Sequence, residues 1–242
     1  MKSADTAAWL VHLYTASGAV LAFLALQATV RADYRLAFLW LFVAVVVDSS
    51  DGWLARRARV AERLPQFDGT RLDDLVDYLT FVFVPAFLLY HAGLLPAVWG
   101  LGVACAILLA SAYAFAARDA KTADHFFTGF PSYWNVVAFY LYAFRISPSV
   151  NALLVLVFCG LVFVRTLYVY PSRTPALRAT TVLLCSAWGA VLLYILWRLP
   201  AIDRLVLGVS LFFPIYYFGL SVALHLRRPL ARRSGPADRF PG

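Results

Sequence analysis

Apolar stretches of about 20 residues recur along the whole chain, separated by short segments rich in charged residues, proline or glycine. A helix of this length spans the hydrocarbon core of a bilayer, because each residue advances it by about 1.5 Å. Hydrophobic side chains make up 62% of the 242 residues, and the mean hydropathy is +0.75. Both values exceed those of soluble domains, so the pattern predicts an all-α, polytopic integral membrane protein.

Dividing the chain at its charged, proline and glycine clusters predicts about eight transmembrane helices. They cover residues 8–30, 36–59, 70–91, 96–118, 131–145, 148–169, 177–198 and 203–226. We expect residues 1–226 to form one transmembrane domain and residues 227–242 to form a basic cytoplasmic tail. The first stretch lacks a strongly basic leader, so we expect a retained helix rather than a cleaved signal.

Arginine and lysine fall mainly in alternate connecting segments, including the one from Arg56 to Arg71 and the tail. Cytoplasmic loops of membrane proteins are enriched in these residues, so both termini are expected in the cytoplasm. The net charge of +8 could also serve nucleic acid, but the arginines cluster at helix ends and no soluble nucleic-acid-binding module is evident. We therefore expect membrane lipids, and no nucleic acid, as the partners of this charge.

Four aspartates flank the basic segment between the second and third predicted helices. They are Asp48, Asp51, Asp73 and Asp77. Helical spacing puts each pair on one face of its helix, with Gly52 and Ala55 beside the first pair and Gly69 beside the second. Asp74 points about 100° away from the second pair. Carboxylates are costly in a membrane, so four converging ones predict a compensating divalent cation.

The residue types around these aspartates suit phosphate chemistry. Carboxylate oxygens are ligands for Mg²⁺ and Mn²⁺, and Arg56 offers a guanidinium fork for phosphate. Two ions about 3.5 to 4 Å apart could bind the attacking and leaving oxygens of an in-line displacement, with Asp77 accepting the proton. One acid at a helix end is as often a cap or an interfacial charge, so the prediction depends on all four acids together.

Two segments resemble the signature of the CDP-alcohol phosphotransferases: D-S-S-D-G-W-L-A-R from Asp48 to Arg56, and G-T-R-L-D-D-L-V-D from Gly69 to Asp77. The resemblance implies a metal-dependent enzyme that moves a phosphoryl-linked group from a CDP-activated donor to an alcohol and releases CMP. It also implies a homodimer. It assigns metal binding to Asp48, Asp51, Asp73 and Asp77, with Asp77 also the catalytic base. It places around the CDP moiety Gly52, Ala55, Arg56 and Gly69.

Twelve residues separate Arg56 from Gly69, a longer spacer than in most of the family. It resembles the bacterial branch that joins choline to CDP-diacylglycerol, as do F-T-G-F-P-S-Y-W-N from Phe127 to Asn135 and F-G-L-S from Phe218 to Ser221. This resemblance implies a multi-pass protein of the bacterial inner membrane whose active site faces the cytoplasm. CDP-diacylglycerol and choline would then be its substrates.

Several residues are candidates for contact with the substrates. They are Tyr78, Ser132, Tyr133, Trp134, Asn135 and Arg173. Aromatic faces bind quaternary ammonium groups, but aromatic residues also form interface belts and packed cores in membranes. Ser132 and Asn135 could border the site or simply begin a helix, and Arg173 could bind lipid phosphate or anchor a cytoplasmic loop. Each of these alternatives stays open at this stage.

Two further functions are compatible with the sequence. The first is another enzyme of the same family, with serine, glycerol phosphate or inositol as the acceptor alcohol. The second is a divalent-cation transporter, because acids within membrane-spanning segments often line ion paths. A transporter would need a continuous polar route, whereas these acids lie near one membrane face.

Overall fold

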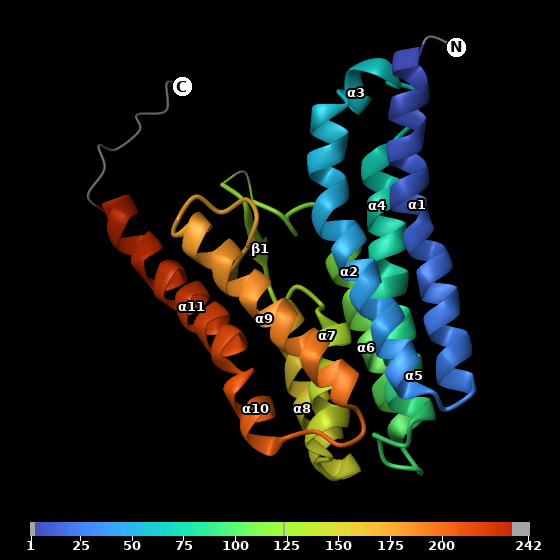
Figure 1. Cartoon of the computed structure of the whole chain (residues 1–242). Coiled ribbons are helices and arrows are strands. Elements are labelled where there is room, and N and C mark those ends of the chain that lie inside the picture. The colour runs from blue at the N-terminus through green and yellow to red at the C-terminus, as the bar shows by residue number, and fades with distance from the viewer. Residues whose placement is uncertain (1–2, 123, 234–242) are drawn as a thin grey trace.

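The computed structural model describes residues 3–122 and 124–233, most of which are helical (Figure 1). Four stretches in this part of the chain are long and apolar enough to cross a membrane, so the protein is a multi-pass membrane protein. They are Asp5–Val30 in α1 (Ser3–Val30), α2 (Tyr34–Arg57), α9 (Arg178–Arg198), and Arg204–Arg227, which covers α10 (Arg204–Val209) and most of α11 (Phe212–Arg233).

The other helices are shorter. They are α3 (Val60–Arg63), α4 (Gly69–Asp77), α5 (Val84–His91), α6 (Gly100–Ala116), α7 (Trp134–Phe144) and α8 (Pro148–Phe163). A π-helical segment, η1 (Tyr78–Phe83), joins α4 directly to α5, so residues 69–91 form the single helix that the sequence predicts. Pro85 has no backbone N–H to donate within this helix, and π-helical turns often lie beside functional sites.

Three details of the predicted architecture are wrong. The chain is not entirely α-helical, because β1 (Phe126–Thr128) pairs antiparallel with β2 (Leu167–Val169). The sixth predicted helix therefore ends at Phe163, and the chain becomes extended at Val164. The last predicted helix is interrupted between α10 and α11, and α11 continues to Arg233. Residues 234–242 of the predicted tail lie outside the described residues, and the tail boundary stays a prediction.

Helices α1, α2 and α4 pack side by side (Figure 1). A turn at residues 31–33 joins α1 to α2, and the Asp33 carboxylate caps α2 by accepting the Leu36 backbone N–H at 3.0 Å. Gly18 allows α1 to approach α4, because a Cβ there would lie 2.4 Å from Val76 Cγ1. Small residues at crossing points allow such close packing in membranes.

The paired strands β1 and β2 contact both of the further motifs of the sequence, Phe127–Asn135 and Phe218–Ser221. Gly129 has a φ of +80°, and a Cβ there would lie 2.2 Å from the Val162 carbonyl oxygen, so only glycine fits. Ser221 of α11 accepts a hydrogen bond from the Val169 backbone N–H at 3.1 Å. The two motifs therefore build the support for the loop that follows β2.

Candidate functional site

Carboxylates from α2 and α4 meet between the two helices. The side chains of Asp48, Asp73 and Asp77 are half-buried, and one oxygen from each lies within 4.8 Å of the other two. Asp48 also makes a side-chain hydrogen-bond contact with Asp77 across the helix interface. The two predicted stripes therefore face one another.

Asp51 makes the second contact between the helices, one turn further along α2. Its carboxyl group is 6% exposed and makes a side-chain hydrogen-bond contact with Asp73. The Thr15 hydroxyl of α1 donates to Asp51 Oδ2 at 2.8 Å. Thr15 therefore fixes the orientation of this carboxylate, although the sequence gives no sign of the pairing.

Two carboxylates at hydrogen-bond distance repel each other unless a proton or a cation lies between them. Two such pairs, Asp48 with Asp77 and Asp51 with Asp73, lie side by side here. The donor set consists of carboxylate oxygens supplied by two helices. These are hard ligands, and they fit Mg²⁺ or Mn²⁺ rather than a metal that prefers sulfur or imidazole. The site can therefore hold a divalent cation.

Two guanidinium groups converge beside this acidic cluster. A Cβ at Gly52 would lie 3.3 Å from Arg56 Nη1 and 3.8 Å from Arg173 Nη2. Arg56 belongs to α2, whereas Arg173 comes from the loop after β2. Arg173 also interacts electrostatically with Asp73. Positive charge from two distant segments thus lies next to the acids, over a residue without a side chain.

A short turn positions Arg173. Its backbone N–H donates to the Tyr170 carbonyl at 3.0 Å, and its guanidinium lies 5.4 Å from the centre of the Tyr170 ring. The Thr174 hydroxyl donates to the His125 carbonyl at 2.6 Å, and it accepts from the Tyr170 backbone N–H at 2.8 Å. These bonds attach the turn to the segment that leads into β1.

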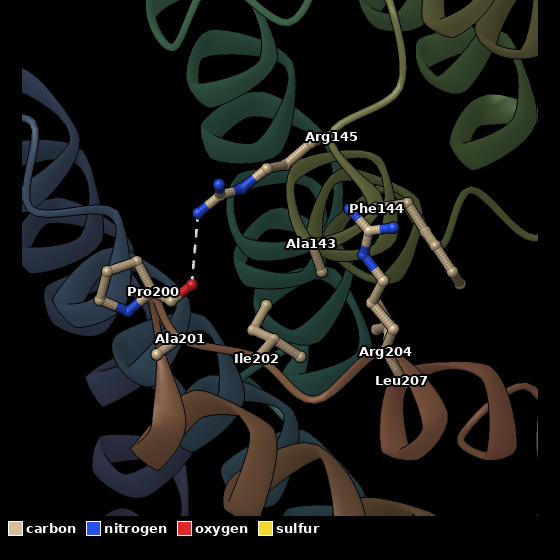
Figure 2. A pocket seen from close by; sticks show the side chains of 8 residues that line it. All are labelled: Ala143, Phe144, Arg145, Pro200, Ala201, Ile202, Arg204 and Leu207. Carbon is tan, nitrogen blue, oxygen red and sulfur yellow. Dashed lines mark hydrogen bonds between the residues drawn. The ribbon is translucent and has the colours of Figure 1, made fainter.

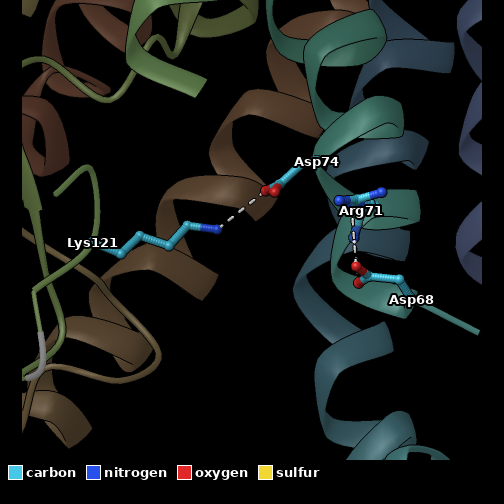
Figure 3. A network of polar contacts seen from close by, with 4 residues as sticks. All are labelled: Asp68, Arg71, Asp74 and Lys121. Carbon is cyan, nitrogen blue, oxygen red and sulfur yellow. Dashed lines mark hydrogen bonds and ion pairs between the residues drawn. The ribbon is translucent and has the colours of Figure 1, made fainter. Parts of the chain in front are cut away.

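Asp74 lies apart from the cluster, as its helical offset predicts. Lys121 Nζ, from the loop after α6, reaches Asp74 Oδ1 at 3.4 Å (Figure 3). Burial lowers the pKa of Lys121, but Asp74 and Asp73 outweigh this effect and hold the pKa above its ordinary value. The ammonium group therefore keeps its charge at the edge of the site. Asp68 caps α4 through the Arg71 backbone N–H and pairs with the exposed Arg71 guanidinium at 3.3 Å.

The small residues predicted to border CDP are in close contact with protein side chains. A Cβ at Gly69 would lie 2.8 Å from His12 Cε1 of α1. His12 is 7% exposed, and its Nε2 has no hydrogen-bond partner among the described residues. Ala55 lies on the acidic face of α2 and packs against Val60 and Leu64.

Three of the predicted substrate contacts have structural partners. The Tyr78 hydroxyl donates to the Leu108 carbonyl at 2.9 Å. Trp134 is fully buried, and its indole N–H donates to Ser111 Oγ at 2.7 Å. The Asn135 side chain accepts the Val136 backbone N–H at the start of α7. These hydrogen bonds account for the side-chain polar groups of Tyr78, Trp134 and Asn135 without a contact to substrate.

Of the remaining predicted contacts, Tyr133 lies near the acids, whereas its neighbour Ser132 is buried and its hydroxyl makes no hydrogen bond with any described residue. Tyr133 interacts electrostatically with Asp48, and so does Tyr170. Sequence reasoning did not select Tyr170, Lys121 or Thr15, which the fold alone brings to the aspartates. Tyr170 directly follows β2. The sequence does not predict the pairing of β1 with β2, and this pairing is what brings Tyr170 to the site.

A separate pocket of about 560 Å³ is lined by residues 143–145 and by residues of the segment from Pro200 to Leu207, and none of the predicted site residues lines it (Figure 2). Arg145 and Arg204 point toward it, and Arg145 donates to the Pro200 carbonyl at 3.3 Å. Its other lining residues are Ala143, Phe144, Ala201, Ile202 and Leu207. It contains no carboxylate and offers no metal ligand set.

Comparison with known proteins agrees with this arrangement. The sequence model of the CDP-alcohol phosphatidyltransferase family matches residues 8–164, which include both acidic stripes. The chain belongs to this family, and it is therefore an enzyme rather than a divalent-cation transporter.

Three similar proteins share one name. The chain is 42% identical to a phosphatidylcholine synthase of Legionella pneumophila, over 89% of this chain and 87% of that protein. It is 38% identical to a phosphatidylcholine synthase of Pseudomonas aeruginosa, over 88% and 90% of the two chains. For a phosphatidylcholine synthase of Rhizobium meliloti, the identity is 36% over 80% of each chain.

Proposed function

We propose that this protein is a phosphatidylcholine synthase, which transfers the phosphatidyl group of CDP-diacylglycerol to choline and releases CMP. One observation carries the proposal: the acids of α2 and α4 converge in a chain that aligns over 89% of its length with a protein of that name. Serine, glycerol phosphate and inositol are the acceptors of the alternative enzymes in the family.

The acids would hold two divalent ions, Mg²⁺ or Mn²⁺. The ligands in this proposal are Asp48, Asp51, Asp73 and Asp77. Bound ions supply charge neutralisation and polarisation to the diphosphate. Thr15 keeps Asp51 in position through its 2.8 Å hydrogen bond.

The nucleotide-linked diphosphate of the donor would lie over Gly52, where Arg56 and Arg173 meet. Guanidinium groups bind phosphate oxygens through paired N–H donors, and the missing side chain leaves space for the approach. Ala55 and Gly69 would border the nucleoside, with His12 moving away from Gly69 to admit it.

Asp77 would act as the catalytic base. The choline oxygen attacks the phosphorus that carries diacylglycerol, while the hydroxyl proton passes to the Asp77 carboxylate. A new oxygen–phosphorus bond forms, and the bond from that phosphorus to the bridging oxygen breaks. CMP leaves with the electron pair of the broken bond. Asp77 then releases its proton to solvent.

The active site would face the cytoplasm of a bacterium, with the chain in the inner membrane. The basic segment Arg56–Arg71 and Lys121 both lie at the acidic end of the bundle, as the positive-inside rule requires of a cytoplasmic face. Labelling of single cysteines at positions 66 and 201 with an impermeant thiol reagent in intact cells tests this orientation. Only position 201 should react from outside.

The family resemblance also leads us to propose a homodimer and about eight spans. The shorter apolar helices α6, α7 and α8 complete the count if they cross the membrane with the four long stretches and residues 69–91. Mass photometry of the protein in nanodiscs distinguishes a dimer of 26.9 kDa chains from a monomer.

An acceptor assay tests the proposed function. Purified protein receives CDP-diacylglycerol, Mn²⁺ and one labelled alcohol at a time, chosen from choline, serine, glycerol phosphate and inositol. We expect phosphatidylcholine and an equal amount of CMP with choline alone. Product with another alcohol and none with choline would contradict the proposal.

A further inference from the structure

Aromatic side chains from four separate segments meet beside the aspartates. Tyr133 precedes α7, Phe127 lies in β1, Tyr170 follows β2, and Tyr217 lies in α11. The ring centres of Phe127 and Tyr133 are 6.4 Å apart, and those of Tyr133 and Tyr217 are 6.1 Å apart. Phe127 stacks on Tyr170 at 4.7 Å. We call these four residues the aromatic cluster.

The cluster lies within reach of the reacting groups. Tyr133 and Tyr170 both interact electrostatically with Asp48, and Tyr170 also interacts with Asp73. Phe81 of η1, four residues after Asp77, places its ring 6.0 Å from that of Tyr133. Phe81 therefore connects the helix that carries Asp77 with the aromatic cluster.

One buried hydroxyl group beside the cluster, Ser132 Oγ, has no hydrogen-bond partner among the described residues, whereas the Tyr217 hydroxyl contacts the Tyr133 hydroxyl. Ser132 is 1% exposed and Tyr217 is 5% exposed. Ser132 also adopts a φ of +56°, which is unfavourable for a residue with a side chain. Buried polar groups nearly always have partners, so an unpaired hydroxyl next to Tyr133 in the chain points to a ligand at this place.

The chemistry of the cluster selects the kind of ligand. A quaternary ammonium group cannot donate N–H hydrogen bonds, and proteins bind it against aromatic faces. An anionic acceptor would need a cationic partner, and none of the four residues of the aromatic cluster carries a positive charge. The Tyr170 ring already contacts both Phe127 and Arg173. Tyr133 is the central ring of the cluster, because Phe81, Phe127 and Tyr217 all lie around it.

We infer that Tyr133, Phe127 and Tyr217, together with Ser132 Oγ, form the binding site for the trimethylammonium group of choline. The inference rests on the proposed function. Tyr170 is a positioning residue, because its ring contacts both Phe127 and Arg173. The hydroxyl end of choline then extends from this site toward Asp77.

The test compares kinetic constants of the full chain and its variants with CDP-diacylglycerol and Mn²⁺. We expect Tyr133→Leu to raise the KM of choline about tenfold, the scale of a desolvated cation–π contact, and to leave the KM of CDP-diacylglycerol unchanged. Tyr133→Phe keeps the ring and should raise the KM of choline less. Tyr142→Leu, a half-buried tyrosine of α7 far from the cluster, is the matched control and should change neither constant.

A neutral isostere of choline, 3,3-dimethylbutan-1-ol, separates the effect of charge from the effect of shape. The unaltered protein should prefer choline strongly over this alcohol, and Tyr133→Leu should reduce the preference. If Tyr133→Leu does not fold, Phe127→Leu with the same two alcohols decides the question. An unchanged KM of choline and an unchanged preference in the folded variants would overturn the inference.

The outcomes also separate this inference from the proposed function. If the unaltered protein makes no phosphatidylcholine from choline but uses another alcohol, the proposed function fails. If it makes phosphatidylcholine while the cluster variants keep the choline KM and the preference, only the choline site is wrong.

Discussion

The aspartate cluster and the arginine-lined pocket lie near opposite ends of α2, and their chemistry differs. Asp48 lies 14 residues beyond Tyr34, which is about 20 Å along a helix axis, whereas the pocket lies at the end where Arg35 of α2 stacks on Trp197 of α9. The pocket has a volume of about 560 Å³ and two arginines, but no acid lines it. At the other end, acids, guanidinium groups and aromatic rings converge.

A cavity alone therefore does not define an active site in this protein. Phosphoryl transfer needs metal ligands, positive charge and a base close to one another. Of the two ends, only the acidic one brings carboxylates and guanidinium groups together among the described residues. Substitutions at the two ends should therefore differ widely in their effect on the reaction.

Asp77→Asn should cause the largest loss. Without the carboxylate, the acceptor proton has no base, and turnover should fall by about 10² to 10⁴-fold while the protein stays folded. Asp74→Asn is the matched control, since this neighbouring acid pairs with Lys121 and not with the cluster. Its turnover should stay close to that of the unaltered protein. Equal turnover in both variants would remove Asp77 from the mechanism.

Arg173→Gln should weaken binding of the donor. A hydrogen bond to a charged group contributes about 1.5 to 3 kcal/mol, so the KM of CDP-diacylglycerol should rise about ten- to hundredfold. Arg178→Gln, an exposed arginine at the start of α9, should leave this KM unchanged. If both variants behave alike, Arg173 only anchors the loop to the membrane surface.

Thr15→Val should weaken metal binding without touching a proposed ligand. The change removes the donor to Asp51 and keeps the shape of the side chain, and loss of such a partner costs about tenfold or more in metal affinity. The Mn²⁺ concentration for half-maximal activity measures the effect. Thr29→Val is the control, because the Thr29 hydroxyl of the same helix donates only to the Ala25 carbonyl. The same Mn²⁺ requirement in both variants would contradict the role of Thr15.

Arg145→Gln and Arg204→Gln should have the smallest effect on the reaction. Both side chains lie at the arginine-lined pocket, so turnover and both KM values should match those of the unaltered protein. Kinetic assays of the purified single and double variants check this expectation. A large fall in turnover of a folded variant would show that the two ends of the bundle are coupled.

The sequence predicts the helical parts of this molecule well because their signals are local. Apolar length gives the membrane helices, and helical spacing places Asp48 and Asp51 on one face and Asp73 and Asp77 on another. The same geometry correctly separates Asp74 from its neighbour. These predictions need only the 3.6-residue period of a helix.

The parts that sequence reasoning missed depend on contacts between distant segments. Strands β1 and β2 pair residues that are about 40 positions apart in the sequence. Each strand has only three residues, too few for a recognisable alternation of apolar and polar side chains. Thr15 meets Asp51 across 36 positions, and Lys121 meets Asp74 across 47. Tyr133 and Trp134 are adjacent aromatic residues, but only packing distinguishes the ring near Asp48 from the ring buried against Ser111.

Anomalous diffraction at the manganese edge, from crystals grown with Mn²⁺, shows whether the acids of α2 and α4 hold a divalent cation. We expect anomalous density between the two helices, within coordination distance of the Asp48, Asp73 and Asp77 carboxylates. Density only elsewhere, or none at this position while Mn²⁺ supports activity under the same conditions, would contradict this expectation.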